Sequence, residues 1–370
     1  MIPKFETDYN SILKKLNKID PIKYGSSRNY IDGSVTYLSP YISRGVISTR
    51  QVLKNVLSRG YTISKIESFV KELCWRDYFQ RVAQVKNINE PIKQEQTPVF
   101  NYEISSKVIH ANIGIDGLDN AIQQLFETGY MHNHCRMYIA SLVCNIAKSH
   151  WFHASQWMYY HLLDGDFASN ACSWQWVSGA NSNKKYYASQ ENINKYTYTN
   201  QSNTFLDKSY EEIEVMQIPK ELLETEKFIF TLDLPENKNI QLNPELPTFI
   251  YNYYNLDPHW HKEKESNRIL LLEPEFFNKY PVNKKCIDFL LELSKNIDGI
   301  QIYTGSFSSL VQEYKLTNIY YKEHPLNTHY SGNKEERDWL VEEVKGYYPS
   351  FFSYWNKIEK NIKKLQYELV

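Results

Sequence analysis

Apolar residues recur at helical spacing through most of residues 1–200. In the stretch 62–86 they fall three or four positions apart, which predicts a long helix with one buried face. Ser64 and Glu67 have capping-box spacing and predict the start of that helix. The stretches 114–129 and 134–151 follow the same rhythm. We therefore expect the first 200 residues to form a mainly α domain.

The pattern changes after residue 200, where short apolar β-type runs alternate with helical ones. Strands are predicted at 227–234, 268–274, 299–305 and 318–325, and helices at 286–297 and 307–316. Strands that alternate with helices predict a small parallel-sheet α/β domain of Rossmann-like type. The predicted boundaries are 1–200 for the helical domain, 201–225 for a linker and 226–370 for the α/β domain.

Charge and composition limit the partners and the compartment that we expect for this protein. Residues 1–200 hold 22 Lys and Arg against 16 Asp and Glu, while the whole chain has a net charge of -1. A basic first half is compatible with a polyanionic partner or with ordinary surface charge. No apolar run could span a bilayer, and the start MIPKFETDYN has no signal-peptide pattern. We expect a cytoplasmic monomer that does not bind membranes.

The cysteines and histidines do not predict a metal site. The five cysteines form no CxxC pair, which predicts reduced thiols. His132 and His134 lie on different faces of a predicted helix, so they cannot share one metal ion.

Two segments carry polar groups that suit a ligand. Ser39 before Pro40 is a helix-start signal, and the exposed amide groups there, together with the Thr36 hydroxyl, could bind an anion. In ELCWRDYF, Glu72, Trp75 and Arg76 share one helix face. Such a face suits a flat, partly polar ligand, but for this motif alone an intrahelical Glu–Arg pair with Trp75 in the core is the better explanation.

Two further segments bring acids, an amide and indoles close together. Arg136 falls on a largely buried predicted helix and therefore requires an anionic partner, which Asp164 or Asp166 could supply. The stretch LLDGDFASNACSWQW holds these two acids, Asn170, and tryptophans at 174 and 176. This set suits a large heteroaromatic ligand with hydrogen-bonding edges, or else a surface.

Taken together, these segments resemble the FAD-binding helical domain of the photolyase/cryptochrome family. Four motifs occur in family order across residues 20–200: SVTYLSPYISRGVIS, ELCWRDYF, MHNHCRM and LLDGDFASNACSWQW. The resemblance implies FAD as cofactor, UV-damaged DNA as partner, and the light-dependent splitting of cyclobutane pyrimidine dimers, a carbon–carbon lyase reaction.

The resemblance implies cofactor roles residue by residue. Arg136 and Asp164 would pair over the flavin ring, and Asn170 would face its N5 atom, where repair enzymes usually carry Asn. The other residues that the resemblance places at FAD are Tyr24, Val35, Thr36, Tyr37, Leu38, Ser39, Phe69, Arg76 and Asp166.

The resemblance also implies substrate roles. Glu72 would hydrogen-bond the pyrimidine pair, and Trp75 and Trp176 would stack on either side of it. Asn133 stands where enzymes that repair the six-four photoproduct carry a catalytic histidine, which favours cyclobutane dimers as the substrate. Arg28 and His134 occupy DNA-backbone positions.

The chain departs from the family pattern in two ways. Trp174 and Trp151 match the proximal and middle tryptophans of an electron relay, but the distal position falls near Val108, so Trp157 or a nearby tyrosine would have to replace it. The α/β segment follows the helical domain instead of preceding it, as if an antenna domain were relocated, and no motif assigns an antenna chromophore. A cryptochrome-like photoreceptor without repair activity, and a flavoprotein that binds DNA without catalysis, remain as alternatives.

Overall fold

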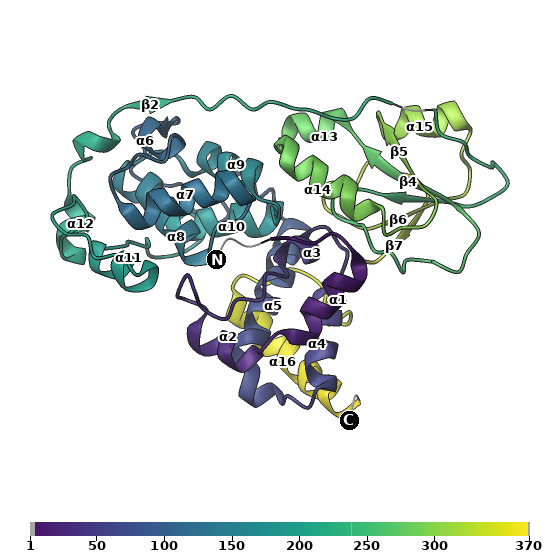
Figure 1. The fold of residues 1–370 in the computed structure, drawn as a ribbon, viewed down its shortest axis with the longest axis horizontal. Helices are drawn as coiled ribbons and strands as arrows, with labels where there is room; N and C mark the ends of the chain where they lie inside the picture. The colour runs from purple at the N-terminus through teal and green to yellow at the C-terminus, as the bar shows by residue number, and fades with distance from the viewer. Residues whose placement is uncertain (1–3, 238, 369–370) are drawn as a thin grey trace. The chain divides into compact units, whose positions relative to one another are not determined.

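The computed structural model describes residues 4–237 and 239–368 and divides into two compact units (Figure 1). Unit 1 contains Lys4 and residues 22–35 and 86–230. Unit 2 contains residues 5–21 and 36–85 and the described residues from 231 onward. The N-terminal half of the chain therefore contributes helices to both units, and unit 2 also holds the α/β part.

Unit 1 is built from helices, with α8, α9 and α10 packed against one another. Asp166 caps the start of α10, and glycines with positive φ end α7 and α10, at Gly129 and Gly179. The helix predicted at 114–129 is confirmed as α7, whereas the one predicted at 134–151 is α8 continued by a π-helical turn. The helices are α2 (Pro21–Ser27), α6 (Ser106–Ile109), α7 (Asp116–Thr128), α8 (Asn133–Ser141), η1 (Leu142–Ile146), α9 (Trp151–His161), α10 (Phe167–Ser178), α11 (Gln190–Thr197), α12 (Tyr210–Val215) and η2 (Lys220–Leu222). Two short strands, β1 (Ile104–Ser105) and β2 (Thr225–Glu226), pair antiparallel.

The helices of unit 2 include the long one predicted from residue 62 onward. They are α1 (Tyr9–Lys18), α3 (Ser39–Ser43), α4 (Thr49–Ser58), α5 (Ile63–Ala83) and α16 (Phe351–Glu368), in addition to the helices that flank the sheet. The predicted capping box at Ser64 and Glu67 is wrong. Helix α5 begins at Ile63 with Thr62 at the cap position, and Glu67 pairs with Lys71 one turn further along the helix.

The helix start predicted at Ser39 is also shifted. Ser39 is the first helical residue of α3, Leu38 occupies the cap position, and no side chain caps the helix. Tyr37, just before it, has a left-handed backbone with φ 52°. The segment before α3 is therefore an irregular turn instead of a serine-capped helix start.

The α/β part is a five-stranded parallel sheet with strand order β5-β4-β3-β6-β7, which confirms the predicted fold class (Figure 1). Its strands are β3 (Thr248–Tyr251), β4 (Asn267–Leu272), β5 (Ile300–Thr304), β6 (Ile319–Lys322) and β7 (Asn333–Glu335), and its helices are α13 (Pro274–Lys279), α14 (Lys284–Ser294) and α15 (Phe307–Tyr314). The chain runs from the central β3 outward to β5 and then returns to β6 on the other side of β3. The strand order thus reverses between β3 and β6.

One predicted strand is wrong and the central strand was not predicted. Residues 227–234 form no strand, because the side chains of Phe228 and Phe230 pack on Tyr160 of α9 instead. The central strand β3 is fully buried, with Phe249, Ile250 and Tyr251 at 0% exposure. Burial on both faces removes the alternation of polar and apolar residues that marks a half-exposed strand.

Unit 2 also joins its N-terminal helices to the sheet. The backbone N–H of Leu256, just after β3, donates to the carbonyl of Arg44 at 2.9 Å. Gly45 has φ +67°, and a Cβ there would collide with the carbonyl oxygen of Tyr254. A glycine is needed where these two backbones approach each other.

Candidate functional site

The ion pair expected between Arg136 and Asp164 is present in unit 1. Nη2 of Arg136 donates to both carboxylate oxygens of Asp164 at 2.9 Å, and Nε donates to the carbonyl of Met131 at 2.8 Å. The Asp164 side chain is 4% exposed and that of Arg136 is 22% exposed. Helix α8 places the arginine, and the turn between α9 and α10 places the aspartate. A buried pair of this kind is stable only while both partners remain.

The first turn of α10 adds further polar groups close in sequence to this pair. Asp166 is buried and accepts from the backbone N–H of Ser169 at 2.8 Å, so it caps the helix. Asn170 is half-buried and donates through Nδ2 to the carbonyl of Ser155 on α9 at 2.9 Å. The Ser169 hydroxyl is buried and has no partner among the described residues.

His132 was not predicted to matter, yet it is a buried polar group at the start of α8. Its Nδ1 accepts from the backbone N–H of His134 at 3.2 Å, and its Nε2 has no partner among the described residues. Burial, with the charge of Arg136 adding to it, lowers the pKa of His132 to about 4. The ring is therefore neutral near pH 7. Within the described ranges no group of three His, Cys, Asp or Glu side chains could hold a metal ion.

The tryptophans expected to form an electron relay lie in two adjacent helices. Trp151 begins α9 and is 0% exposed, and Trp174 on α10 is 2% exposed. Val108, at the expected distal position, is fully buried. Next to Trp151, the ring of His150 is stacked on Tyr102 with centroids 5.2 Å apart. Tyr102 is 64% exposed, so this row of rings reaches the surface.

Trp157, the other candidate for the distal position, also lies on α9. It is 0% exposed and lies edge-on to His161 and Phe126. The indole N–H groups of Trp151 and Trp157 have no partner among the described residues. Both candidates for the distal position named from the sequence, Trp157 and a tyrosine, are therefore available in unit 1.

Trp176 differs from its neighbour Trp174 because it faces solvent. Its side chain is 40% exposed and tilts against Tyr186, with ring centroids 5.9 Å apart. Side chains two positions apart on a helix point to different faces. Helix α10 therefore directs the Trp174 indole inward and the Trp176 indole toward solvent. An exposed indole is suited to stacking on an aromatic ligand.

The two expected DNA-backbone residues lie near each other in unit 1. His134 is half-buried, and burial together with the charge of Arg28 lowers its pKa. The guanidinium of Arg28 also lies 5.8 Å from the ring of Tyr24. Asn133, the first residue of α8, is exposed. The sequence thus identified a local cluster at the start of α8.

Among the other residues expected at the cofactor, those of the segment 36–39 belong to unit 2. Val35 is the last residue of a segment of unit 1. Thr36 accepts through Oγ1 from the backbone N–H of Leu38 at 3.3 Å. Tyr37 and Ser39 are half-buried, and Leu38 is buried. This irregular segment has the hydroxyl groups and the left-handed turn that a phosphate-binding loop requires.

Helix α5 carries four of the expected residues. Phe69 is 3% exposed, Glu72 and Trp75 are half-buried, and Arg76 donates to the Ser43 hydroxyl at 2.6 Å. Trp75 lies face to face with Phe351 of α16, with ring centroids 3.8 Å apart.

Asp77, one residue beyond Arg76, is an ionisable group that sequence reasoning passed over. It accepts from the Thr49 hydroxyl at 2.9 Å and from the backbone N–H of Leu340 at 2.8 Å. Burial raises its pKa to about 6. Its position between Arg76 and Tyr78 in the ELCWRDYF motif gave no signal that it joins α5 to both α4 and the C-terminal segment.

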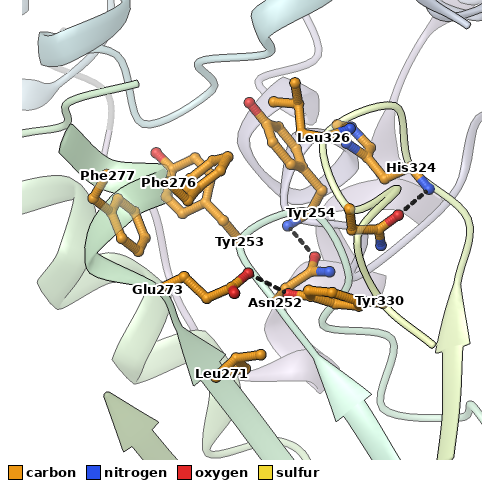
Figure 2. Close-up of a pocket in the computed structure, with 11 residues that line it drawn as sticks. Asn252, Tyr253, Tyr254, Leu271, Glu273, Phe276, Phe277, His324, Leu326 and Tyr330 are labelled. Atoms are coloured by element: carbon orange, nitrogen blue, oxygen red, sulfur yellow. Dashed lines mark hydrogen bonds between the residues drawn. The ribbon is translucent and has the colours of Figure 1, made fainter. Parts of the chain in front are cut away.

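The α/β part has a pocket of about 330 Å³ at the carboxyl ends of β3, β4 and β6, shown in Figure 2. Tyr254 and His324 form one wall as a stacked pair with centroids 4.2 Å apart. Glu273 accepts from the backbone N–H of Phe307 at 3.0 Å and from the Tyr330 hydroxyl at 2.9 Å, and it pairs with His329 at 3.0 Å. The pocket lies where the strand order reverses, but the carboxylate in it is already satisfied by neighbouring residues.

The groups in unit 1 fit a flavin by their chemistry. A guanidinium, two carboxylates, a carboxamide and an unpaired serine hydroxyl can meet a ring system whose edge carries both hydrogen-bond donors and acceptors. The residues that would hold this edge are Arg136, Asp164, Asp166, Ser169 and Asn170. Asp164 and Asp166 are buried, and separation from bulk water strengthens their hydrogen bonds.

Comparison with known proteins identifies this region. Residues 69–233 match the model of the FAD binding domain of DNA photolyase. A deoxyribodipyrimidine photo-lyase of Agrobacterium fabrum is 30% identical over 45% of this chain and 37% of its own length. One from Synechococcus is 30% identical over 44% of this chain and 36% of its own length. The chain thus spans little more than a third of these relatives.

A solved structure of a Synechocystis cryptochrome is also similar, at 21% identity over 53% of this chain and 44% of that chain, with a TM-score of 0.44. No described helix is both long enough and apolar enough to cross a membrane. The sequence match covers α8, α9 and α10, which carry the Arg136–Asp164 pair, and FAD is the cofactor for which the matched domain is described. Residues 69–233 of this chain are therefore similar to the FAD binding domain of DNA photolyase.

Proposed function

We propose that this protein binds FAD and uses blue light to split cyclobutane pyrimidine dimers in DNA. The observation that carries the proposal is the buried Arg136–Asp164 pair, because it lies within the segment that matches the FAD binding domain of DNA photolyase. The names of the curated relatives support the same reaction.

In this proposal each residue keeps the cofactor role that the family resemblance implies for it. Arg136, Asp164, Asp166 and Asn170 hold the flavin edge, and the segment 35–39 holds the diphosphate with Tyr24 nearby. Phe69 and Arg76 contact the cofactor from α5. When bound in its reduced form, FAD supplies the light absorption and the electron that opens the cyclobutane ring.

The protein's own residues recognise and hold the lesion. Trp75 and Trp176 stack on the extruded pyrimidines, and stacking of about 1–3 kcal/mol per base offsets the cost of extrusion. Glu72 hydrogen-bonds the pyrimidine pair, and Asn133 lies at its edge. Arg28 and His134 contact the backbone of the damaged strand.

Trp174 and Trp151 serve as the inner steps of an electron route that keeps the cofactor reduced. The stacked His150 and Tyr102 support Tyr102 as the surface point where electrons enter, because that ring is exposed and lies in a row with Trp151. The parallel sheet of unit 2 is proposed as a relocated antenna-like domain, and we expect the protein to act as a cytoplasmic monomer.

A repair assay tests this function. The FAD-loaded, chemically reduced protein is mixed with an oligonucleotide that carries one thymine dimer, under blue light and in the dark. Light-dependent recovery of intact thymines supports the proposal. Binding without recovery would favour a flavoprotein that binds damaged DNA, and no binding combined with a light-induced conformational change would favour a cryptochrome-like photoreceptor.

A further inference from the structure

The C-terminal helix α16 lies along α5, the helix that carries Glu72 and Trp75. The two run antiparallel, because the Gln366 side chain near the end of α16 accepts from the backbone N–H of Ile63 at the start of α5, at 2.7 Å. Midway, the Lys71 ammonium lies 5.0 Å from the ring of Trp355. At the other end, Phe351 covers Trp75. This helix lies outside residues 69–233, and its apolar pattern was not recognised in the sequence.

The contact between Phe351 and Trp75 is a face-to-face stack. The ring centroids are 3.8 Å apart and the ring planes differ by 8°. Tyr78 touches both rings edge-on, at 5.7 Å from Trp75 and 6.0 Å from Phe351. Phe79 tilts against the same indole at 5.2 Å. One face of the Trp75 indole is therefore fully used within the protein, and its plane is fixed.

Phe351 is held firmly in this position. Its side chain is 3% exposed, and the residues that follow on the same face of α16 are buried as well: Tyr354 at 1%, Ile358 at 0% and Ile362 at 0%. Moving Phe351 away from Trp75 would expose apolar surface at the start of a helix that is otherwise packed along its length. The stack is therefore a fixed part of unit 2.

We propose that Phe351 is a positioning residue of the damage-binding surface: it fixes the Trp75 indole so that a base can stack only on the opposite face. This inference rests on the proposed function, in which Trp75 contacts the pyrimidine dimer. A half-buried indole that is already immobilised loses less side-chain freedom when a base stacks on it. Such preorganisation contributes to affinity without a new contact to the ligand.

The expected effect is moderate and specific for damage. Removing the stack should weaken binding of a dimer-containing oligonucleotide by roughly 3- to 10-fold, the range that one immobilised side chain contributes. Binding of the undamaged strand should change little, because it depends mainly on phosphate contacts. The ratio of the two dissociation constants is therefore the quantity that reports on Phe351.

The experiment uses the full FAD-loaded chain in the dark. Dissociation constants are measured for an oligonucleotide with one thymine dimer and for its undamaged twin. The variants are Phe351→Leu, which keeps apolar volume but not a flat ring, and Phe351→Tyr, which keeps the ring. Phe352→Ala is the matched control, because Phe352 is the next residue and is 66% exposed. FAD content and thermal midpoint establish that each variant is folded.

A double-mutant cycle with Trp75→Ala distinguishes positioning from general stability. We expect Phe351→Leu to lower the damage preference, Phe351→Tyr and Phe352→Ala to keep it, and Phe351→Leu to have no further effect once Trp75 is removed. The inference is overturned, while the proposed function stands, if Phe351→Leu lowers the damage preference equally with and without the Trp75 side chain. It is also overturned if Phe351→Leu leaves the damage preference unchanged. A stronger preference in Phe351→Leu also overturns it, since Phe351 would then cover the face that the base uses. If the wild type itself does not prefer the dimer, both the inference and the proposed function fail.

Discussion

Arg136 on α8 and Asp164 after α9 form a two-point ion pair, in which one guanidinium nitrogen lies 2.9 Å from each carboxylate oxygen. Removing the arginine takes the guanidinium partner away from the buried Asp164 carboxylate, and breaking a pair of this kind costs about 3–5 kcal/mol. We therefore expect Arg136→Ala to lose most of its bound FAD, as measured by flavin absorbance after gel filtration.

Two controls accompany this substitution. Arg136→Lys keeps the charge but loses the donation from Nε to the Met131 carbonyl, and it should retain an intermediate amount of FAD. Lys284→Ala removes an exposed ion pair with Asp288 and should leave the flavin content unchanged. Normal FAD affinity in Arg136→Ala would mean that this pair does not support the cofactor.

Glu72 should matter for repair and not for cofactor binding. A hydrogen bond to a charged group contributes about 1.5–3 kcal/mol, so Glu72→Ala should slow light-dependent repair by roughly 10- to 100-fold with FAD retained. Repair is followed by chromatography of the restored thymines. Glu67→Gln on the same helix, which removes the carboxylate that pairs with Lys71, serves as control. If flavin is lost together with repair, the role assigned to Glu72 is wrong.

The row of rings from Trp151 through His150 to Tyr102 predicts where electrons enter the protein. Because electron transfer weakens steeply with distance, Tyr102→Phe should slow the light-driven reduction of bound FAD, and Trp151→Phe should slow it further. The bleaching of oxidised flavin absorbance gives the rate. Tyr198→Phe changes an equally exposed tyrosine, which is stacked on Tyr30 elsewhere in unit 1, and should have no effect. Slowing by Trp157→Phe alone would show that electrons enter through Trp157 instead.

Asp77 should make the stability of unit 2 depend on pH. Burial raises its pKa in the folded state to about 6, above the usual value of 3.8, so the folded form binds its proton more tightly than the unfolded form. The stabilisation is fully present below about pH 4 and is lost as pH rises through 6. At about 1.4 kcal/mol per pKa unit, the loss amounts to about 3 kcal/mol.

Comparison with Asp77→Asn isolates this effect, because asparagine does not titrate. The variant loses a hydrogen-bond acceptor for the N–H of Leu340 at every pH, which gives a constant offset. The stability difference between wild type and variant, from urea unfolding at pH 4 to 7, should shrink as pH rises. A difference that stays constant across this range would show that Asp77 keeps an ordinary pKa.

Local sequence patterns determined a large part of this structure. Helical periodicity predicted α5 and α7, and the β-type runs predicted β4, β5 and β6. Because a buried arginine requires an anionic partner, the sequence predicted that Arg136 pairs with Asp164 or Asp166. The predicted starts of the helices were less accurate, because α5 begins before Ser64 and α3 begins at Ser39 itself. The first residue of a helix depends on which backbone amides the preceding chain leaves free.

Other features depended on partners far away in the sequence. Residues 227–234 look like a strand, but Phe228 and Phe230 find aromatic partners on α9 and the segment pairs with no other strand. The true central strand, β3, has no alternation because neighbours cover both of its faces. Phe351 follows Trp75 by 276 positions in the sequence. Their rings come into contact only because the chain returns to α5 after the last strand of the sheet.

The sequence by itself therefore determined which segments are helical or extended and which groups could bind a flavin, since those properties depend on neighbours within one or two turns. Only the tertiary structure decided which strand lies at the centre, which helix covers Trp75, and which acid pairs with Arg136. These outcomes depend on which surfaces are brought together when the chain folds, and local periodicity carries no information about a partner hundreds of residues away.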